Sequence, residues 1–348
     1  MKKEESTVLQ GIAVLMMIMH HFFLDVSTYP ENFFLLPDFF QRFAWSGRMC
    51  VAIFSFVSGY GMYQTLKKKN VFEHMIKDCT KRLFNLYARV FLVIIFCVYI
   101  PRFLRGEHLL ISQLPGNIIG YNSTYNGAWW FVLEYLWFMI LAPILAMIVS
   151  SRMKMGKRIL LVLILGMAGL FGKGIIFYNP EVVNFFEVRM QPTFLFVFAE
   201  GFFVGKIQDF VAGMNWSDKI QKHLDRIRCP IAGFSFCLIS LMLRYLYTTE
   251  PYKVNADVLL VPVFCCGVTL WLKKTSKIKS TLTFIGENSL YLWFVHNFVY
   301  AGLIHFILDW SGYWLVFFLV LFTVSLGVAI LLEKIEKIIK MRILPNRV

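Results

Sequence analysis

Charged residues are scarce in this chain, and no polar stretch is long enough to form a separate soluble domain. They make up 16% of the 348 residues, whereas hydrophobic residues make up 58%. An ordinary soluble domain has roughly 45–50% apolar and about 25% charged residues. This deficit excludes a soluble globular protein, and it predicts an integral membrane protein.

Patterns typical of metal sites and disulfide frameworks are also missing. The seven cysteines form no CxxC pair, and no HExxH motif occurs among the seven histidines. Cysteines without such spacing usually serve as small apolar residues in the interior of a protein. We therefore expect neither a bound metal nor a disulfide framework.

Long apolar runs, by contrast, occur throughout the chain. A helix of about 20 apolar residues crosses the roughly 30 Å hydrocarbon core of a bilayer. Ten such runs predict an all-α, polytopic membrane protein that forms a single transmembrane domain over residues 1–348. They lie at about 8–27, 49–66, 83–101, 128–150, 158–178, 191–211, 229–248, 256–273, 282–308 and 313–333.

Acidic residues are outnumbered by basic ones, with 21 Asp and Glu against 35 Lys and Arg and a net charge of +14. If the N-terminus is cytoplasmic, most of the basic residues fall in connections on the cytoplasmic side, as is typical of membrane proteins. The pattern predicts that both termini are cytoplasmic. A basic face beside anionic lipid accounts for the charge, so the lipid bilayer is the expected partner and nucleic acid is not.

Three of the expected helices carry titratable residues at a similar depth. At 1.5 Å per residue, His21 and His296 lie about 20 Å from the cytoplasmic ends of their helices, and Glu134 lies about 9 Å from the outer end of its helix. Ionisable groups in hydrocarbon are costly and usually mark a functional site. Two imidazoles and a carboxylate suit general acid–base catalysis. A polar network that joins helices, or a proton-coupled transporter, would use the same groups.

The neighbouring His20 points about 100° away from His21 on a helix, so it is expected to be a polar packing residue.

The residues around His21 resemble the first helix of the acyltransferase-3 family of membrane acyltransferases. Leu9–Ala13 and Met19–His21 carry this resemblance. In the family, ten residues separate a basic residue from the catalytic His. By that spacing His21 matches the His, while Gln10 stands where the family usually has Arg.

Four later segments resemble family motifs in the same order, so the likeness spans residues 9–296. They are Val51–Tyr60 (FFxxSGF), Lys81–Tyr87 (RRxxRxxP), Trp129–Tyr135 (WFLxxE) and Gly286–His296 (SYSIYLxH). Asn85 and Tyr87 depart from the second of these motifs.

The resemblance implies transfer of an acyl group, most often acetyl from acetyl-CoA, to a hydroxyl of a cell-envelope glycan or a lipid-linked saccharide. The protein would be an O-acetyltransferase, with the bacterial cytoplasmic membrane as its location. His21 would be the general base, and Glu134 and His296 would complete the catalytic group. The expected substrate contacts are Lys81, Arg82 and Gln10 for acyl-CoA, and Asp25, Arg48 and Trp130 for the acceptor.

Two other functions fit the same residues. One is a transporter or flippase for a glycan or small solute, which needs intramembrane charges but no acyl donor. The other is a catalytically inactive membrane scaffold, which the departures at Gln10 and Asn85 would allow. Hydrolysis of acetyl-CoA that is lost in His21→Ala would separate an enzyme from both.

Overall fold

The structure is a computed structural model of the chain, and it describes residues 1–24, 37–69, 71–150, 154, 156–157, 160, 191–214, 229–249, 254–272, 276–308 and 314–343. Every regular element within these ranges is a helix, as expected of an all-α membrane protein. The helix expected at 158–178 lies outside the described residues, apart from position 160.

Most of the described helices are long. The longer ones are α1 (Lys3–Phe22), α3 (Met49–Leu66), α4 (Phe72–Ile94), α7 (Phe131–Ser150), α10 (Pro192–Ala212), α12 (Pro230–Tyr247), α13 (Asp257–Trp271), α15 (Ser289–Leu308) and α16 (Trp314–Ile343). The shorter ones are α2 (Pro37–Gly47), the π-helix η2 (Ile95–Tyr99), α5 (Ile100–Leu104), the 3₁₀ helix η3 (Ile111–Gln113), α6 (Leu114–Ile119), the 3₁₀ helix η4 (Gly127–Trp130) and α14 (Ser276–Glu287).

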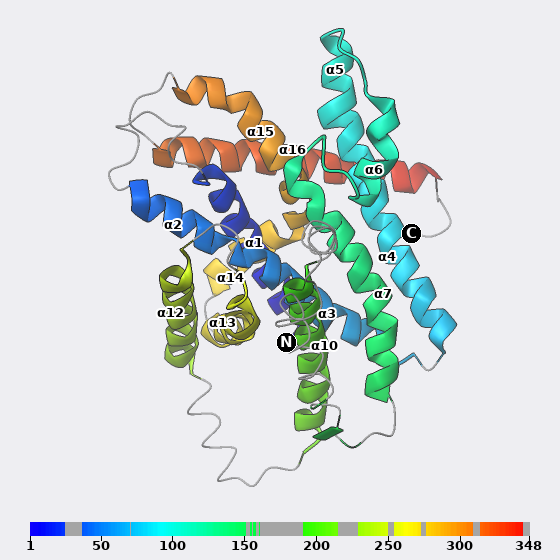
Figure 1. Cartoon of the computed structure of the whole chain (residues 1–348), viewed down its shortest axis with the longest axis vertical. Coiled ribbons are helices and arrows are strands. Elements are labelled where there is room, and N and C mark those ends of the chain that lie inside the picture. Colours follow the sequence, from blue (N-terminus) through cyan, green and yellow to red (C-terminus); the bar gives the residue numbers. More distant parts are fainter. Residues whose placement is uncertain are drawn as a thin grey trace, which may run out of the picture.

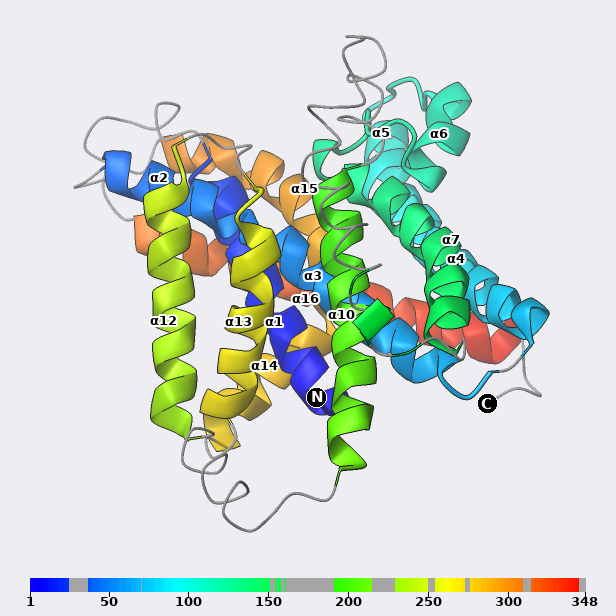
Figure 2. The same cartoon turned by 60° about the horizontal axis from the view of Figure 1, so that its bottom comes forward.

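The helices α1 and α3 pack against each other near the middle of the bundle (Figures 1 and 2). On one side, α10 lies against α3, and the pair α12 and α13 follows with α12 outermost. On the opposite side, α4 packs on α7, and α5 and α6 project beyond their ends (Figure 2). The pair α15 and α16 packs against α1 and α4. The buried core is therefore centred on α1 and α3.

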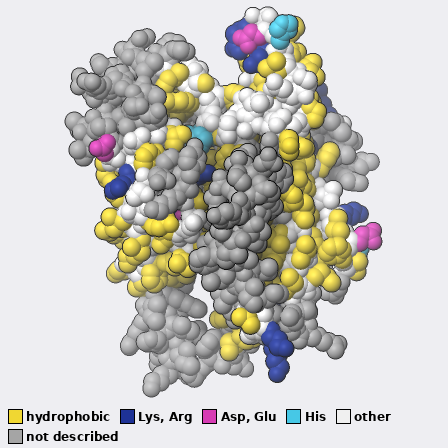
Figure 3. Space-filling view, in the orientation of Figure 1, with side chains coloured by type: hydrophobic (Ala, Val, Ile, Leu, Met, Phe, Trp, Pro, Cys, Tyr) yellow, Lys and Arg dark blue, Asp and Glu magenta, His cyan; other side chains and the backbone are white. Residues whose placement is uncertain are grey.

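Four helical segments are long and apolar enough to cross a membrane within the part of the chain that the structure describes. They are Phe72–Leu104, Gly127–Val149, Pro230–Tyr247 and Trp314–Arg342. Their outer surfaces are apolar, and on α12 the side chains of Ile231 and Leu246 are 78% and 62% exposed. Hydrophobic side chains also cover much of the face in Figure 3. Such surfaces are stable against lipid. The total of ten spans remains a prediction.

Glycines allow the central helices to approach closely. A Cβ atom added to Gly59 of α3 would overlap the carbonyl oxygen of Phe198 on α10, and one added to Gly201 would overlap that of Phe56. The same holds where Gly286 of α14 meets the backbone of Thr7 on α1. Small residues at such crossings bring helix backbones into direct contact in membranes.

The ends of some helices differ from the expected ones. The helix expected at 49–66 has these bounds, whereas the one expected at 83–101 begins earlier, at Phe72 of α4. The first turns of α4 are amphipathic, so they form a helix without an apolar run. The segment expected as one helix over 282–308 is divided, since α14 ends at Glu287 and α15 begins at Ser289. At the break, Asn288 Nδ2 donates to the Phe284 carbonyl, a local bond of the kind that competes with the helix ladder.

Candidate active site

Two histidines from different helices are in contact inside the bundle. The last turn of α1 presents His21, and the middle of α15 presents His296. Their ring centroids lie 4.9 Å apart in an edge-to-face arrangement. His296 is 1% exposed, so the pair is shielded from bulk solvent on that side. The structure thus joins two of the three titratable residues that the sequence placed at one depth.

Main-chain carbonyls orient the ring of His296. Its Nδ1 lies 2.8 Å from the Trp293 oxygen and 3.1 Å from the Leu292 oxygen. A carbonyl can only accept a hydrogen bond, so Nδ1 carries the proton. The other ring nitrogen, Nε2, is buried and has no hydrogen-bond partner among the described residues. Neutral His296 therefore keeps a lone pair on Nε2 that an incoming hydroxyl group can use.

The neighbouring His20 has a packing role. Its Nδ1 donates to the Ala44 carbonyl of α2 over 2.7 Å, and Gly47 packs closely against its Cα and Cβ atoms. It is buried and joins α1 to α2. This agrees with the polar packing expected from its direction on the helix.

His21 is held by an amide side chain. Its Nδ1 lies 3.1 Å from Oδ1 of Asn297, the residue after His296. Asn297 Nδ2 donates in turn to Oδ1 of Asn126 over 3.0 Å. The sequence reasoning missed both asparagines. A polar residue directly after His296 in an apolar helix was the signal for Asn297, whereas Asn126 lies in a connection whose path the sequence does not indicate.

Glu134 has its hydrogen-bond partner on a segment outside the histidine pair. Its carboxylate is 2% exposed and accepts a hydrogen bond from the main-chain N–H of Gln191 over 2.9 Å. Its second oxygen, Oε1, is buried without a partner among the described residues. Within that part of the chain, no hydrogen bond joins Glu134 to either His21 or His296.

The residues expected to contact an acceptor lie near Glu134 and His20. Trp130 is four residues before Glu134 and packs on Phe194, and the guanidinium of Arg48 lies 5.7 Å from the centre of its ring. Arg48 is buried and directly follows Gly47, which touches His20. The structure therefore brings Arg48 and Trp130 together. Asp25 lies outside the described residues.

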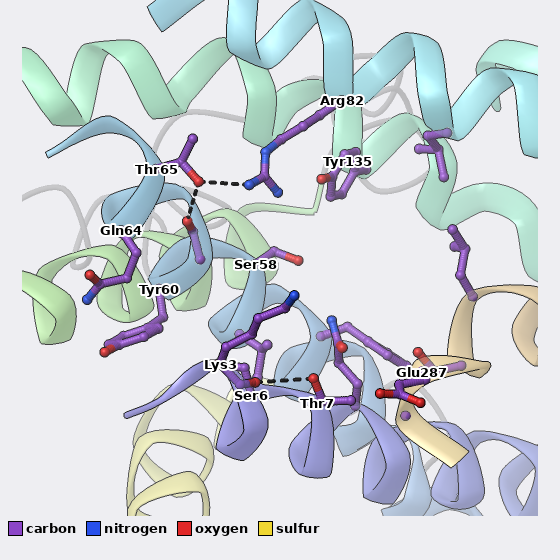
Figure 4. Close-up of a pocket in the computed structure, with 18 of the residues that line it drawn as sticks. Lys3, Ser6, Thr7, Ser58, Tyr60, Gln64, Thr65, Arg82, Tyr135 and Glu287 are labelled. Atoms are coloured by element: carbon purple, nitrogen blue, oxygen red, sulfur yellow. Dashed lines mark hydrogen bonds between the residues drawn. The ribbon is translucent and has the colours of Figure 1, made fainter. Parts of the chain in front are cut away.

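A cavity of about 1020 Å³ opens on the side where α1 begins. Its walls come from α1, α3, α4, α7 and the junction of α14 and α15 (Figure 4). It extends along α15 as far as Trp293, three residues before His296, a rise of about 4.5 Å on a helix. Its size suits an extended cofactor-sized ligand.

Basic side chains predominate among the charged residues of the cavity wall. Lys2, Lys3, Arg82 and Arg89 line it, against the single carboxylate of Glu287. Arg82 reaches from α4 toward α3, where its Nη2 donates to Thr65 Oγ1 over 2.7 Å (Figure 4). A wall of this charge favours a polyanionic ligand.

Two of the three residues expected to bind acyl-CoA are part of this wall. Gln10 and Arg82 both line the cavity. Lys81 is exposed and is not one of the lining residues.

Arg89 is a wall residue to which the sequence assigned no role. Its Nε lies 3.0 Å from both carboxylate oxygens of Glu336 on α16, and the Tyr291 hydroxyl donates to the same carboxylate over 2.9 Å. These bonds place the C-terminal half of α16 beside the cavity, on the side where α1 begins. Which face of the membrane this side meets remains a prediction.

No group of three or more His, Cys, Asp or Glu side chains able to hold a metal ion occurs among the described residues.

The described helices form a membrane bundle in which the contact between His21 and the buried His296 lies close to the inner end of a basic cavity. This is the layout of an integral membrane enzyme. Comparison with known families identifies which one. A family model described as an acyltransferase domain matches residues 4–334, nearly the whole chain. The protein belongs to this family, the acyltransferase-3 family, and is a membrane acyltransferase. Searches of curated proteins and of solved structures gave no match.

Proposed function

We propose that the protein transfers an acyl group, most simply acetyl, from acyl-CoA to a hydroxyl group of a cell-envelope glycan or lipid-linked saccharide. It would act as a multi-pass protein of the bacterial cytoplasmic membrane. The family supplies the reaction class, and the two substrates are inferred from the cavity and from the groups around His21.

The position of the cavity is the observation that carries this proposal. It begins at the basic residues near the start of α1 and ends at Trp293, whose carbonyl oxygen also accepts the hydrogen bond from His296. A long, polyanionic donor can leave its phosphates at Lys3 and Arg82 and extend its thioester toward the histidines. His21 is eleven positions after Gln10 on α1, so this path is about 16 Å long. Acyl-CoA has the required charge at one end and a reactive thioester at the other.

The chemistry assigned to His21 is general base catalysis. Nε2 of His21 takes the proton of the acceptor hydroxyl as the oxygen attacks the thioester carbonyl carbon. The C–S bond then breaks, and the CoA thiolate receives the proton from the imidazolium. Ester and free thiol are the products, and His21 returns to its neutral form. The lone pair on Nε2 of His296 is suited to orient the acceptor hydroxyl.

Glu134, Arg48 and Trp130 are assigned to the acceptor. The buried Oε1 of Glu134 can accept a hydrogen bond from a second hydroxyl of a saccharide, and Trp130 offers an aromatic face beside it. Asp25 is retained as an acceptor contact from its place after α1 in the sequence. Because Asn297 already holds the His21 ring, Glu134 is not needed for that task.

Release of CoA thiol from acetyl-CoA by the purified, detergent-solubilised protein tests the proposal, first with water and then with envelope glycan fractions as acceptor. His21→Gln should abolish thiol release. His20→Gln is the matched control, because glutamine can still donate to the Ala44 carbonyl, and it should retain activity per amount of folded protein. Solute flux without thiol release would indicate a transporter instead, and absence of both would indicate a scaffold.

A further inference from the structure

We propose that Asn126 and Asn297 form a positioning relay that fixes the proton of His21 on Nδ1 and so makes Nε2 its basic nitrogen. The inference deepens the proposed function and rests on it for its catalytic meaning, because it assigns the atom through which His21 acts.

The orientation of Asn126 is set by main-chain groups. Its Oδ1 accepts a hydrogen bond from the N–H of Ala128 over 3.0 Å, and its Nδ2 donates to the carbonyl of Phe294 over 3.3 Å. A main-chain N–H can only donate and a carbonyl can only accept. The two ends of the Asn126 amide are therefore distinguished, and its oxygen faces the Ala128 N–H.

The orientation of Asn297 follows from that of Asn126. Its Nδ2 donates to the Asn126 oxygen over 3.0 Å, which leaves its own Oδ1 facing Nδ1 of His21 at 3.1 Å. An amide oxygen is an acceptor, so Nδ1 of His21 must carry the proton. In the neutral ring the lone pair is then on Nε2.

The turn that carries Asn126 is hydrogen-bonded to α15, the helix that carries Asn297. The indole of Trp293 on α15 donates to the Ala128 carbonyl over 3.2 Å, and the indole of Trp129 donates back to the Phe294 carbonyl over 3.3 Å. Asn126 and Trp129 are both buried, at 6% and 0% exposure. The turn at 126–129 and α15 are thus joined by hydrogen bonds. Asn126 and Asn297 belong to these two segments, whereas His21 comes from α1.

Histidine tautomers can be read directly by ¹⁵N NMR, since a protonated and an unprotonated ring nitrogen have different shifts. The protein with ¹⁵N-labelled histidine has seven such residues, and the His21 signals are those lost in His21→Gln. We expect the wild type to show protonated Nδ1 and unprotonated Nε2 at His21. Asn297→Leu, which keeps the size but removes the acceptor, should shift His21 toward protonated Nε2. A wild-type ring protonated on Nε2 would overturn the proposal.

Two further variants keep the test independent of folding. Asn126→Asp retains a group that can only accept from Asn297 Nδ2, so it should keep the Nδ1–H form, whereas Asn126→Leu should lose it. Asn288→Leu is the matched control: Asn288 is also a buried amide, at the break between α14 and α15, and its Nδ2 donates to the Phe284 carbonyl and not to a residue of the relay. This control should leave the His21 signals unchanged, and equal changes in all variants would show a merely structural role.

The kinetic consequence is a change in turnover rather than in donor binding. We expect Asn297→Leu to lower kcat for acyl transfer about 10- to 100-fold, as is common when a group that orients a catalytic residue is lost, with the KM for acyl-CoA within about twofold. A rise in KM at unchanged kcat would contradict a positioning role. The NMR result stands whether or not acyl transfer is found, so failure of the relay and failure of the proposed function are distinguishable.

Discussion

Arg82 is expected to contribute more to acyl-CoA binding than its neighbour Lys81, although both side chains carry one positive charge on α4. Arg82 lines the cavity, and its Nη2 is held by Thr65 Oγ1 at 2.7 Å. Lys81 is exposed and is not a wall residue. The two alanine substitutions remove the same charge from adjacent positions, so any difference between them measures contact with the ligand and not general electrostatic attraction.

The size of the effect follows from the position of Arg82. A hydrogen bond to a charged group contributes about 1.5–3 kcal/mol, and solvent exposure of Arg82 favours the lower end of this range. Since about 1.4 kcal/mol corresponds to a tenfold change in affinity, Arg82→Ala should raise the Kd for acetyl-CoA about tenfold. Lys81→Ala should change it less than about twofold. Thr65→Val removes the hydroxyl that holds Arg82, so a smaller increase, of about two- to threefold, is expected.

The assay is calorimetric titration of acetyl-CoA into the purified protein at low and high salt, with KM values from thiol release as a second measure. The Debye length falls to about 3 Å at 1 M salt, so the affinity of the wild type for acetyl-CoA should fall as salt rises. The affinity of Arg82→Ala should depend less on salt, because one of the attracting charges is gone. Equal weakening by Arg82→Ala and Lys81→Ala would refute the contact. If Arg82→Ala leaves the affinity for acetyl-CoA unchanged, this wall of the cavity does not bind the phosphates.

Two further predictions concern the acceptor side and the helix crossings. Glu134→Gln keeps the size of the side chain but replaces a carboxylate, so acyl transfer to the glycan should fall at least tenfold. Size-exclusion chromatography should show little loss of folded protein. Equal loss of activity and of folded protein would indicate a structural role. Gly59→Ala should destabilise the bundle by about 1–3 kcal/mol or more, because its Cβ would overlap the Phe198 carbonyl. The measurement is a lower Tm. Gly61→Ala on the same helix is the control and should have little effect, because a Cβ atom there has no other atom within 4 Å.

The sequence predicted features that depend on composition and on position along a helix. The predominantly apolar run at 49–66 predicted α3 correctly, and the depth argument found His21 and His296, whose rings are in contact. Depth gives height in the bundle but not the direction in which a side chain points. For that reason Glu134 was expected beside the histidines, although its hydrogen bond comes from Gln191 on the segment before α10.

The features that the sequence missed depend on contacts between distant segments. The break at Asn288 falls inside a run with no Pro and only one Gly nearby, so hydropathy indicates one continuous helix. The position of Asn126 depends on hydrogen bonds from two tryptophan indoles that join its turn to α15. Arg89 likewise becomes a cavity residue through a partner on α16, almost 250 positions later in the chain.

The walls of the basic cavity are supplied by segments from both halves of the sequence, from Lys3 on α1 to Trp293 on α15. No fragment that lacks either end can form it, and it exists only once the helices have assembled. Any molecule that fills it therefore binds the assembled bundle in preference to the dispersed helices and protects that bundle against heat in proportion to its concentration and affinity. Thermal protection by candidate donors thus offers a way to identify the occupant before the acceptor is known.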